Sequence, residues 1–214
     1  KTRLLGRWGI TMRYLIVILI GYLIGSSSMS YYLGRLNNIN VAKKGSGNLG
    51  ASNMVVIMGW KAGILVALHD ILKAYIAIML ARYLFADLPY VAELAGVACV
   101  IGHIFPFYLK FKGGKGLASY IGMTIALDWK FAIALIVICA LLTLITDYIV
   151  TATFTTIISV PAYIGLFNKN LIAFFILSVA TLVMFYKHVE NIKRLKNGTE
   201  IGLRSANKGE HRVK

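Results

Sequence analysis

Long apolar runs alternate with short polar connections along most of this chain. The runs cover residues 14–33, 54–85, 91–109, 116–127, 131–145, 149–167 and 171–186. A helix that crosses a bilayer needs about 20 mainly apolar residues, so most of these runs are long enough to cross. The pattern therefore predicts an all-α, polytopic integral membrane protein with about seven transmembrane helices.

Two of the runs are less regular than the others. Residues 54–85 carry several charged side chains, and we predict one long helix there, starting near Trp60, with the preceding residues dipping into the membrane interface. Residues 116–127 are too few to cross comfortably, so this run is either a fourth helix or a re-entrant segment.

Composition supports the membrane class and narrows the possible partners. Hydrophobic residues make up 58% of the 214 positions and charged residues 14%, and the mean hydropathy is +0.74. The net charge of +15 would suggest nucleic acid in a soluble protein, but the aromatic residues lie in the apolar runs rather than among the cations. We therefore expect no nucleic-acid partner, and cations that face anionic membrane lipid or an anionic substrate.

The basic residues are concentrated in alternate connections, which predicts the orientation. They follow the first, third and seventh runs, whereas the other connections carry few charges. Basic loops stay in the cytoplasm, so we expect the N-terminus outside and the C-terminus in the cytoplasm.

The first residues depart from this charge pattern. Residues 1–11 contain basic side chains on the predicted outer side, and we interpret them as either upstream sequence or an interfacial segment. Residues 12–200 form the membrane domain, and residues 201–214 a basic cytoplasmic tail.

For the polar side chains inside the apolar runs, we consider a structural role before a catalytic one. Asp70 and Lys73 are three residues apart on one helical face, and we predict a structural ion pair rather than a catalytic one. His69 and His103 could carry protons, but a lone histidine is more often a packing residue with satisfied hydrogen bonds. The spacing of Cys and His residues predicts no metal site.

The first loop carries the glycine-rich sequence of residues 45–53. Its candidate binding residues are Gly45, Ser46, Gly47, Asn48 and Asn53. Glycines let the backbone turn sharply and bring N–H groups close to a ligand. A plain flexible turn is an equally good interpretation of these residues alone.

The second loop pairs glycines with lysines at the predicted start of a helix. The residues are Lys112, Gly113, Gly114 and Lys115. Backbone donors, the positive end of the helix dipole and ammonium groups together favour a phosphate. The alternative is a cytoplasmic anchor in which the glycines are linkers.

The end of the seventh run adds an imidazole and an amide. His188 and Asn191 share one helical face at the inner membrane surface, where they could meet both loops. An imidazole there could act as a general acid or base. The alternative is a basic amphipathic tail lying on anionic lipid.

Taken together, these motifs resemble those of the PlsY family, the bacterial acyl-phosphate-dependent glycerol-3-phosphate acyltransferases. The resemblance rests on residues 45–53, 102–116 and 188–200, with shorter matches at 59–63 and 70–73. It implies a multi-pass enzyme of the bacterial inner membrane, with no cofactor. Such an enzyme moves an acyl group from acyl phosphate to the 1-hydroxyl of glycerol 3-phosphate, giving lysophosphatidic acid and phosphate.

The resemblance also implies roles for individual residues. Ser46, His188 and Asn191 would support catalysis, and Glu200 would be structural. The substrate-binding set would be Gly45, Gly47, Asn48, Asn53, Lys61, His103, Lys112, Gly113, Gly114 and Lys115.

Three positions depart from the family pattern. Val56 and Ala42 stand where arginines are expected, and Val150 where a serine is expected. A lysine replaces a guanidinium clamp only partly, although Lys43, Lys44 or Lys61 could compensate. The departures leave two alternatives open: a diverged enzyme that acylates another acceptor, or a non-catalytic lipid- or partner-binding membrane protein.

Overall fold

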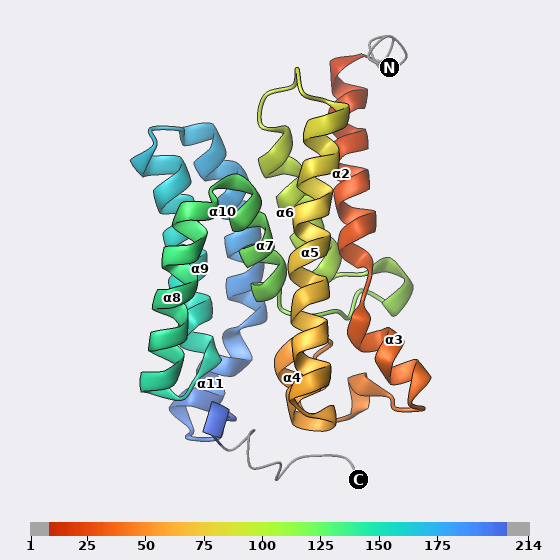
Figure 1. The fold of residues 1–214 in the computed structure, drawn as a ribbon, viewed down its shortest axis with the longest axis vertical. Coiled ribbons are helices and arrows are strands. Elements are labelled where there is room, and N and C mark those ends of the chain that lie inside the picture. Colours follow the sequence, from red (N-terminus) through yellow and green to blue (C-terminus); the bar gives the residue numbers. More distant parts are fainter. Residues whose placement is uncertain (1–8, 205–214) are drawn as a thin grey trace.

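The computed structural model describes residues 9–204, and this part of the chain is helical, without strands (Figure 1). The α-helices are α2 (Ile10–Ser26), α3 (Met29–Leu36), α4 (Ala51–Met58), α5 (Trp60–Leu84), α6 (Val91–Ile104), α7 (Leu117–Leu127), α8 (Trp129–Thr146), α9 (Ile149–Pro161), α10 (Leu171–Lys187) and α11 (Val189–Lys196). Short 3-10 turns cover Val41–Lys43 and Phe107–Leu109, and a π-helical stretch, η3 (Ala162–Phe167), continues α9. The N-terminal extension predicted for residues 1–11 and the tail predicted for 201–214 lie largely outside the described residues.

Five segments of the described chain are long and apolar enough to cross a membrane. They are Ile10–Leu36, Trp60–Leu84, Val91–Leu109, Trp129–Thr146 and Ile149–Phe167. A sixth is formed if α10 and α11 are taken together across their 43° bend. The prediction of a polytopic helical membrane protein is therefore confirmed.

The first predicted helix, residues 14–33, is broken between α2 and α3, so the prediction of a single helix there was wrong. In the second run the long helix α5 is present as predicted, and the residues before it form the separate helix α4. At the first break, the Ser28 side chain accepts a hydrogen bond from the Tyr31 backbone N–H and starts α3 anew. At the second, Gly59 has φ +84°, a left-handed conformation that a glycine adopts without strain. The chain turns there, and α4 packs back against α5, which begins at Trp60 as expected.

The weakest predicted span, 116–127, is the short helix α7. At about 1.5 Å per residue, the 11 residues of α7 cover only about half of a bilayer's hydrocarbon core. It packs against α5, α6 and α8. It is therefore a short helix enclosed by the longer ones, and its first residues line the cavity described below.

Close helix contacts depend on small residues. A Cβ added to Gly25 of α2 would lie 2.0 Å from the Cys99 carbonyl oxygen, and one added to Gly102 of α6 would lie 2.2 Å from the Tyr22 carbonyl oxygen. Small residues at such contacts let membrane helices approach closely. This packing helps to make α6 the most enclosed of the spans.

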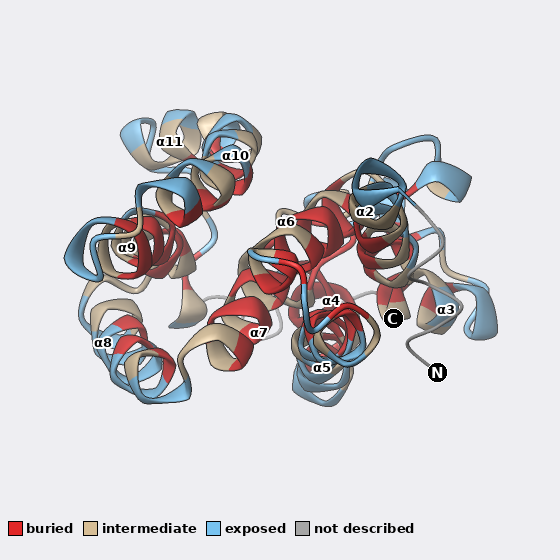
Figure 2. Ribbon diagram, turned by 90° about the horizontal axis from the view of Figure 1, so that it is seen from above, coloured by how far each residue is buried: buried red, intermediate tan, exposed pale blue. Residues whose placement is uncertain are grey.

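The outward faces of the bundle are apolar, as a lipid-facing surface requires. Seen along the bundle, the exposed residues lie on the outer sides of α2, α5, α8 and α9, and the buried ones face inward (Figure 2). Large exposed side chains such as Ile76 of α5, Ile138 of α8 and Ile158 of α9 belong to these outer faces. The chain is a multi-pass integral membrane protein.

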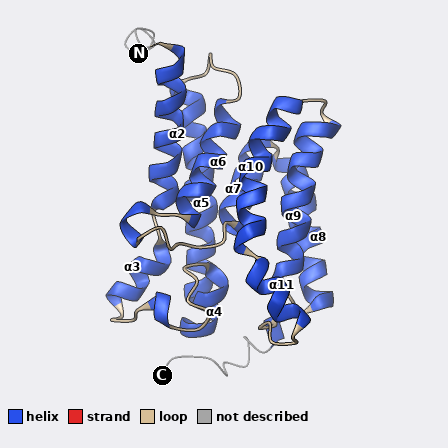
Figure 3. Ribbon diagram, turned by 180° about the vertical axis from the view of Figure 1, so that it is seen from behind, coloured by secondary structure: helices blue, strands red, loops and turns tan. Residues whose placement is uncertain are grey.

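Polar segments gather toward one half of the bundle. Helices α3, α4 and α11 lie at the end opposite the N-terminus (Figure 1). The connection between α6 and α7 lies beside the junction of α2 and α3 (Figure 3). There the Tyr22 hydroxyl donates a 2.8 Å hydrogen bond to the Phe105 carbonyl oxygen. The first loop (residues 37–50) and the second loop (105–116) therefore come together although they are far apart in sequence.

Candidate active site

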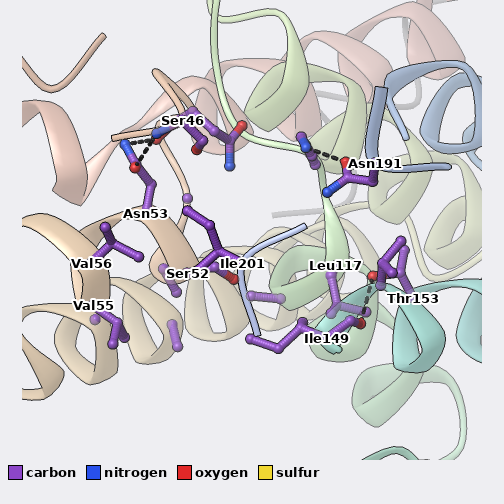
Figure 4. Close-up of a pocket in the computed structure, with 18 of the residues that line it drawn as sticks. Ser46, Ser52, Asn53, Val55, Val56, Leu117, Ile149, Thr153, Asn191 and Ile201 are labelled. Atoms are coloured by element: carbon purple, nitrogen blue, oxygen red, sulfur yellow. Dashed lines mark hydrogen bonds between the residues drawn. The ribbon is translucent and has the colours of Figure 1, made fainter. Parts of the chain in front are cut away.

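A cavity of about 720 Å³ opens where the two loops meet α5, α7, α9 and the end of α10. Its polar wall contains Gly45, Ser46, Asn48, Asn53, Lys115, His188, Asn191, Arg194 and Glu200. Its opposite wall is apolar and includes Val56, Ile64, Leu117, Ile121, Ile149 and Val150. The close-up in Figure 4 shows Ser46, Asn53 and Asn191 along one side and Leu117 and Ile149 along another. A molecule with a charged head and a hydrocarbon chain fits such a cavity.

The first loop is held in one shape by the side chain of Asn53. Its Oδ1 accepts a hydrogen bond from the Ser46 backbone N–H at 2.9 Å, and its Nδ2 donates to the carbonyl oxygens of Lys44 at 3.2 Å and Asn48 at 2.9 Å. Gly45 has φ +55°, and a Cβ there would lie 2.2 Å from Asn53 Oδ1. The loop is therefore an ordered turn that presents Ser46 to the cavity, and Asn53 supports it from behind.

The paired glycines of the second loop have a packing role. The Gly113 N–H donates to the Ile104 carbonyl and the Gly114 N–H to the His103 carbonyl, each at 3.1 Å. A Cβ on Gly114 would lie 2.0 Å from His103 Nε2. Since both N–H groups already have acceptors, the expectation that they cradle a phosphate is not met in this structure.

Backbone donors reach the cavity slightly further along the chain. Gly116, Leu117 and Ala118 line it at the N-terminus of α7. The N–H groups in the first turn of a helix have no acceptor within that helix, and the helix dipole is positive there. The start of α7, three residues beyond Gly114, therefore offers backbone donors and the positive end of a helix dipole to the cavity.

Lys115 is the central cation of the polar wall. Its Nζ donates to Asn191 Oδ1, and Asn191 Nδ2 donates to Glu200 Oε1 at 2.5 Å. Arg194 Nε forms a 2.7 Å ion pair with Glu200 Oε2. Burial, followed by the repulsion of Arg194, lowers the pKa of Lys115 from its usual value to about 8. A partly desolvated ammonium of this kind gains from an incoming phosphate.

His188 is held in one tautomer by a backbone carbonyl. Its Nδ1 lies 2.7 Å from the Met184 carbonyl oxygen, which can only accept a hydrogen bond. Nδ1 therefore carries the proton, and Nε2 keeps its lone pair. The ring is 4% exposed and lies edge-on to Phe154. A buried, neutral imidazole whose Nε2 keeps its lone pair can accept a proton from a hydroxyl group.

The predicted ion pair between Asp70 and Lys73 is confirmed, at 2.7 Å. Lys73 also donates to the Ser27 carbonyl oxygen at 2.7 Å, and its Nζ lies 2.9 Å from His103 Nδ1. The cluster joins α5 and α6 to the break between α2 and α3. It satisfies polar groups inside the membrane and positions His103, on which Gly114 packs.

The structure brings together only part of the predicted site. Ser46, His188 and Asn191 all line the cavity, as do Gly45, Asn48, Asn53, His103 and Lys115. Gly47, Lys61, Lys112, Gly113 and Gly114 are not among its lining residues. Lys43 and Lys44, considered as substitutes for the expected arginines, do not line it either.

Arg194 and the residues after Glu200 were missed by sequence reasoning. Arg194 was interpreted as part of a basic surface tail, yet it lines the cavity. Ile201, Gly202 and Leu203 also line it, because the Leu203 N–H donates to the Asp147 carbonyl oxygen at 2.8 Å and ties the segment across the site. The ion pair of Arg194 with Glu200, six residues apart across a turn, is not visible in sequence periodicity.

Fold and cavity together define a class: a multi-pass membrane protein with an amphipathic site where polar loops enter the bundle. Residues 15–198 match the model of the glycerol-3-phosphate acyltransferase family, and the chain belongs to that family.

Individual relatives match over nearly their whole length. Glycerol-3-phosphate acyltransferase 1 of Oceanobacillus iheyensis is 37% identical, over 91% of this chain and 97% of its own. The glycerol-3-phosphate acyltransferase of Alkaliphilus metalliredigens is also 37% identical, over 87% and 94%.

Solved structures of glycerol 3-phosphate acyltransferases also resemble this chain in fold. The crystal structure of PlsY, an integral membrane glycerol 3-phosphate acyltransferase, in its glycerol 3-phosphate form superposes with a TM-score of 0.82 at 30% identity, over 89% of this chain and 95% of that one. Its lysophosphatidic acid form gives a TM-score of 0.80, over 91% and 97%.

Proposed function

We propose that this protein transfers the acyl group of an acyl phosphate to the 1-hydroxyl of glycerol 3-phosphate, giving lysophosphatidic acid and phosphate. The observation that carries the proposal is the two-sided cavity. Lys115, Arg194 and the start of α7 suit a phosphate, while the wall from Ile64 to Val150 suits an acyl chain. Similarity along the whole chain to glycerol-3-phosphate acyltransferases supports this function over the two alternatives raised by the sequence.

The reaction needs little beyond positioning and charge, because an acyl phosphate is already an activated anhydride. The 1-hydroxyl oxygen attacks the acyl carbon, a C–O ester bond forms, and the bond from that carbon to the phosphate oxygen breaks. Phosphate leaves with the electron pair, and the hydroxyl proton passes to His188 Nε2. Lys115 and Arg194 would neutralise phosphate charge.

The remaining candidates have supporting roles in this proposal. Ser46, presented by the ordered first loop, would hydrogen-bond substrate. Asn191 would hold Lys115 in place, and Glu200 would hold Asn191 and Arg194. His103, Asn48 and Asn53 would shape the walls of the cavity.

The basic loops support an orientation and a location. With the first and second loops in the cytoplasm, the N-terminus lies outside and the C-terminus inside, and the host membrane is the bacterial inner membrane. Both substrates would then enter from the cytoplasmic side, where the polar wall opens.

The test is an assay of the purified, membrane-reconstituted protein with palmitoyl phosphate or palmitoyl-CoA as donor. Glycerol 3-phosphate or glycerol would serve as acceptor. We expect equal amounts of lysophosphatidic acid and phosphate with palmitoyl phosphate and glycerol 3-phosphate, and none with glycerol. Turnover with palmitoyl-CoA alone, or with glycerol as readily as with its phosphate, would contradict the proposal.

A further inference from the structure

A second cavity, of about 430 Å³, lies beside the first and contains none of the proposed catalytic residues. It is enclosed by α3, the first loop and the second loop. Its lining residues are Tyr31, Gly34, Arg35, Asn38, Ile39, Asn40, Val41, Ala42, Leu49, Leu109, Lys110 and Lys112. The proposed acyl transfer leaves this cavity unexplained.

Three cations meet at the second cavity without a counter-charge. Arg35 comes from α3, and Lys110 and Lys112 come from the second loop, far away in sequence. Within residues 9–204, none of the three takes part in an ion pair or a side-chain hydrogen bond. Like charges held together without a partner repel one another, and a bound anion removes that repulsion.

The interior of the second cavity is apolar beneath these cations. Val41 and Leu49 are buried in its wall. At Gly34 the first loop packs directly against α3. The Ile39 N–H donates to the Gly34 carbonyl oxygen at 2.8 Å, and a Cβ on Gly34 would lie 2.7 Å from the Ile39 carbonyl oxygen. A small inorganic anion would use the cations and leave this apolar surface uncovered.

One aromatic side chain, Tyr31, lines the second cavity, and further aromatic residues of the second loop lie next to it in sequence or in contact with it. Tyr31 contacts Tyr108 edge-to-face with 5.8 Å between ring centroids, and Tyr108 contacts Phe107 in the same way. Phe107 is 53% exposed and Phe111 58% exposed. Exposed aromatic rings beside basic residues are typical of the level at which lipid headgroups lie.

We propose that the second cavity binds the phosphate group of an anionic membrane lipid, with Arg35, Lys110 and Lys112 around the phosphate and the apolar wall against the first carbons of the lipid chains. This site is independent of the proposed acyl transfer. It also assigns Lys112, expected from the sequence to bind substrate, to a different ligand.

Neighbouring residues of the first loop line different cavities around Leu49. Leu49 lines the second cavity, whereas Asn48 and Gly50 line the first. The Leu49 N–H approaches the Gly113 carbonyl oxygen at 3.4 Å, which joins the two loops.

The experiment is native mass spectrometry of the full chain released from nanodiscs that contain equal amounts of phosphatidylglycerol and phosphatidylcholine. The test variant is Arg35→Gln/Lys110→Gln. The control variant, Lys130→Gln/Lys169→Gln, removes the same charge at positions that line neither cavity. Gel-filtration profiles check that each variant is folded.

We expect phosphatidylglycerol to remain bound to the unmodified chain and the control, and about tenfold less to remain on the test variant. Inorganic phosphate at millimolar concentration should not displace it. Equal retention by the test and control variants would overturn the proposal. Displacement by inorganic phosphate would show that the cavity takes a free anion, and would overturn the assignment to a lipid.

Discussion

The two cavities both contain basic side chains, but they hold them in different ways. In the first, Lys115 and Arg194 are fixed by Asn191 and Glu200 and are partly withdrawn from water. In the second, Arg35, Lys110 and Lys112 are exposed and have no partner among the described residues. Fixed, desolvated cations suit a reaction in which charge must be placed accurately, whereas exposed cations suit the attraction of a headgroup.

The difference shows why a basic loop should not be treated as one site. Lys112 and Lys115 are separated only by two glycines, yet they line different cavities. The glycines make this possible, because the chain packs tightly against His103 between the two lysines.

His188→Ala should have the largest effect. Loss of the proton acceptor should lower kcat about 100-fold or more, as for other general bases. Steady-state kinetics with glycerol 3-phosphate measure it. His69→Ala is the matched control, because His69 contacts Ser27 and Asp70 and does not line the cavity. Comparable losses in both variants would mean that His188 acts only through packing.

Asn191→Leu should lower kcat/KM for glycerol 3-phosphate about 30-fold. The substitution keeps the volume but removes the acceptor of Lys115 and a donor to Glu200, which corresponds to about 2 kcal/mol for bonds to charged groups. Asn37→Leu is the control, because the exposed Asn37 amide bonds only to the carbonyl oxygen of Leu33, one turn earlier. An unchanged kcat/KM for Asn191→Leu would break the proposed link between Asn191 and the phosphate.

The pH dependence should follow the ionisation of Lys115. Its pKa of about 8 in the free protein means that the ammonium is present below pH 8 and is lost as the pH rises through it. We expect kcat/KM for glycerol 3-phosphate to fall about 20-fold between roughly pH 7.5 and 9.5. In Lys115→Arg the guanidinium stays charged, so this fall should disappear. A fall of the same size in both proteins would assign the ionisation to another group.

Val56→Arg/Val150→Ser should have the smallest effect. Both valines line the apolar part of the cavity, and Lys115 and Arg194 already supply cations to the polar wall. We expect kcat/KM for glycerol 3-phosphate to stay within about tenfold of that of the unmodified chain. Activity that appears only in the double variant would support a non-catalytic native protein.

The spans and the general location of the site could be predicted from the sequence, because hydropathy and positive charge are local properties. The start of α5 at Trp60 was predicted, but the break at Ser28 and the packing of α4 back against α5 were not, since they depend on contacts between helices. The packing of Gly113 and Gly114 against the end of α6 could not be predicted for a similar reason. Their N–H groups bond to the end of α6, which sequence spacing does not show.

Among the site residues, His188 and Asn191 were identified because their motif places both on one helical face. Arg194 was missed because a basic tail explains an arginine equally well until Glu200 is seen beside it. Lys61 and Lys112 were included because of the family resemblance and their charge, and neither of these shows into which cavity a side chain points.

The central claim is that Lys115 binds the substrate phosphate in the first cavity and that Lys112 serves the second cavity. Its most direct test is a kinetic comparison of Lys115→Met with Lys112→Met in the palmitoyl phosphate assay. The account predicts that Lys115→Met lowers kcat/KM for glycerol 3-phosphate about 100-fold, with a smaller effect on the KM for palmitoyl phosphate. Lys112→Met should remain close to the unmodified protein. Equal losses in the two variants, or equal effects of Lys115→Met on both KM values, would contradict it.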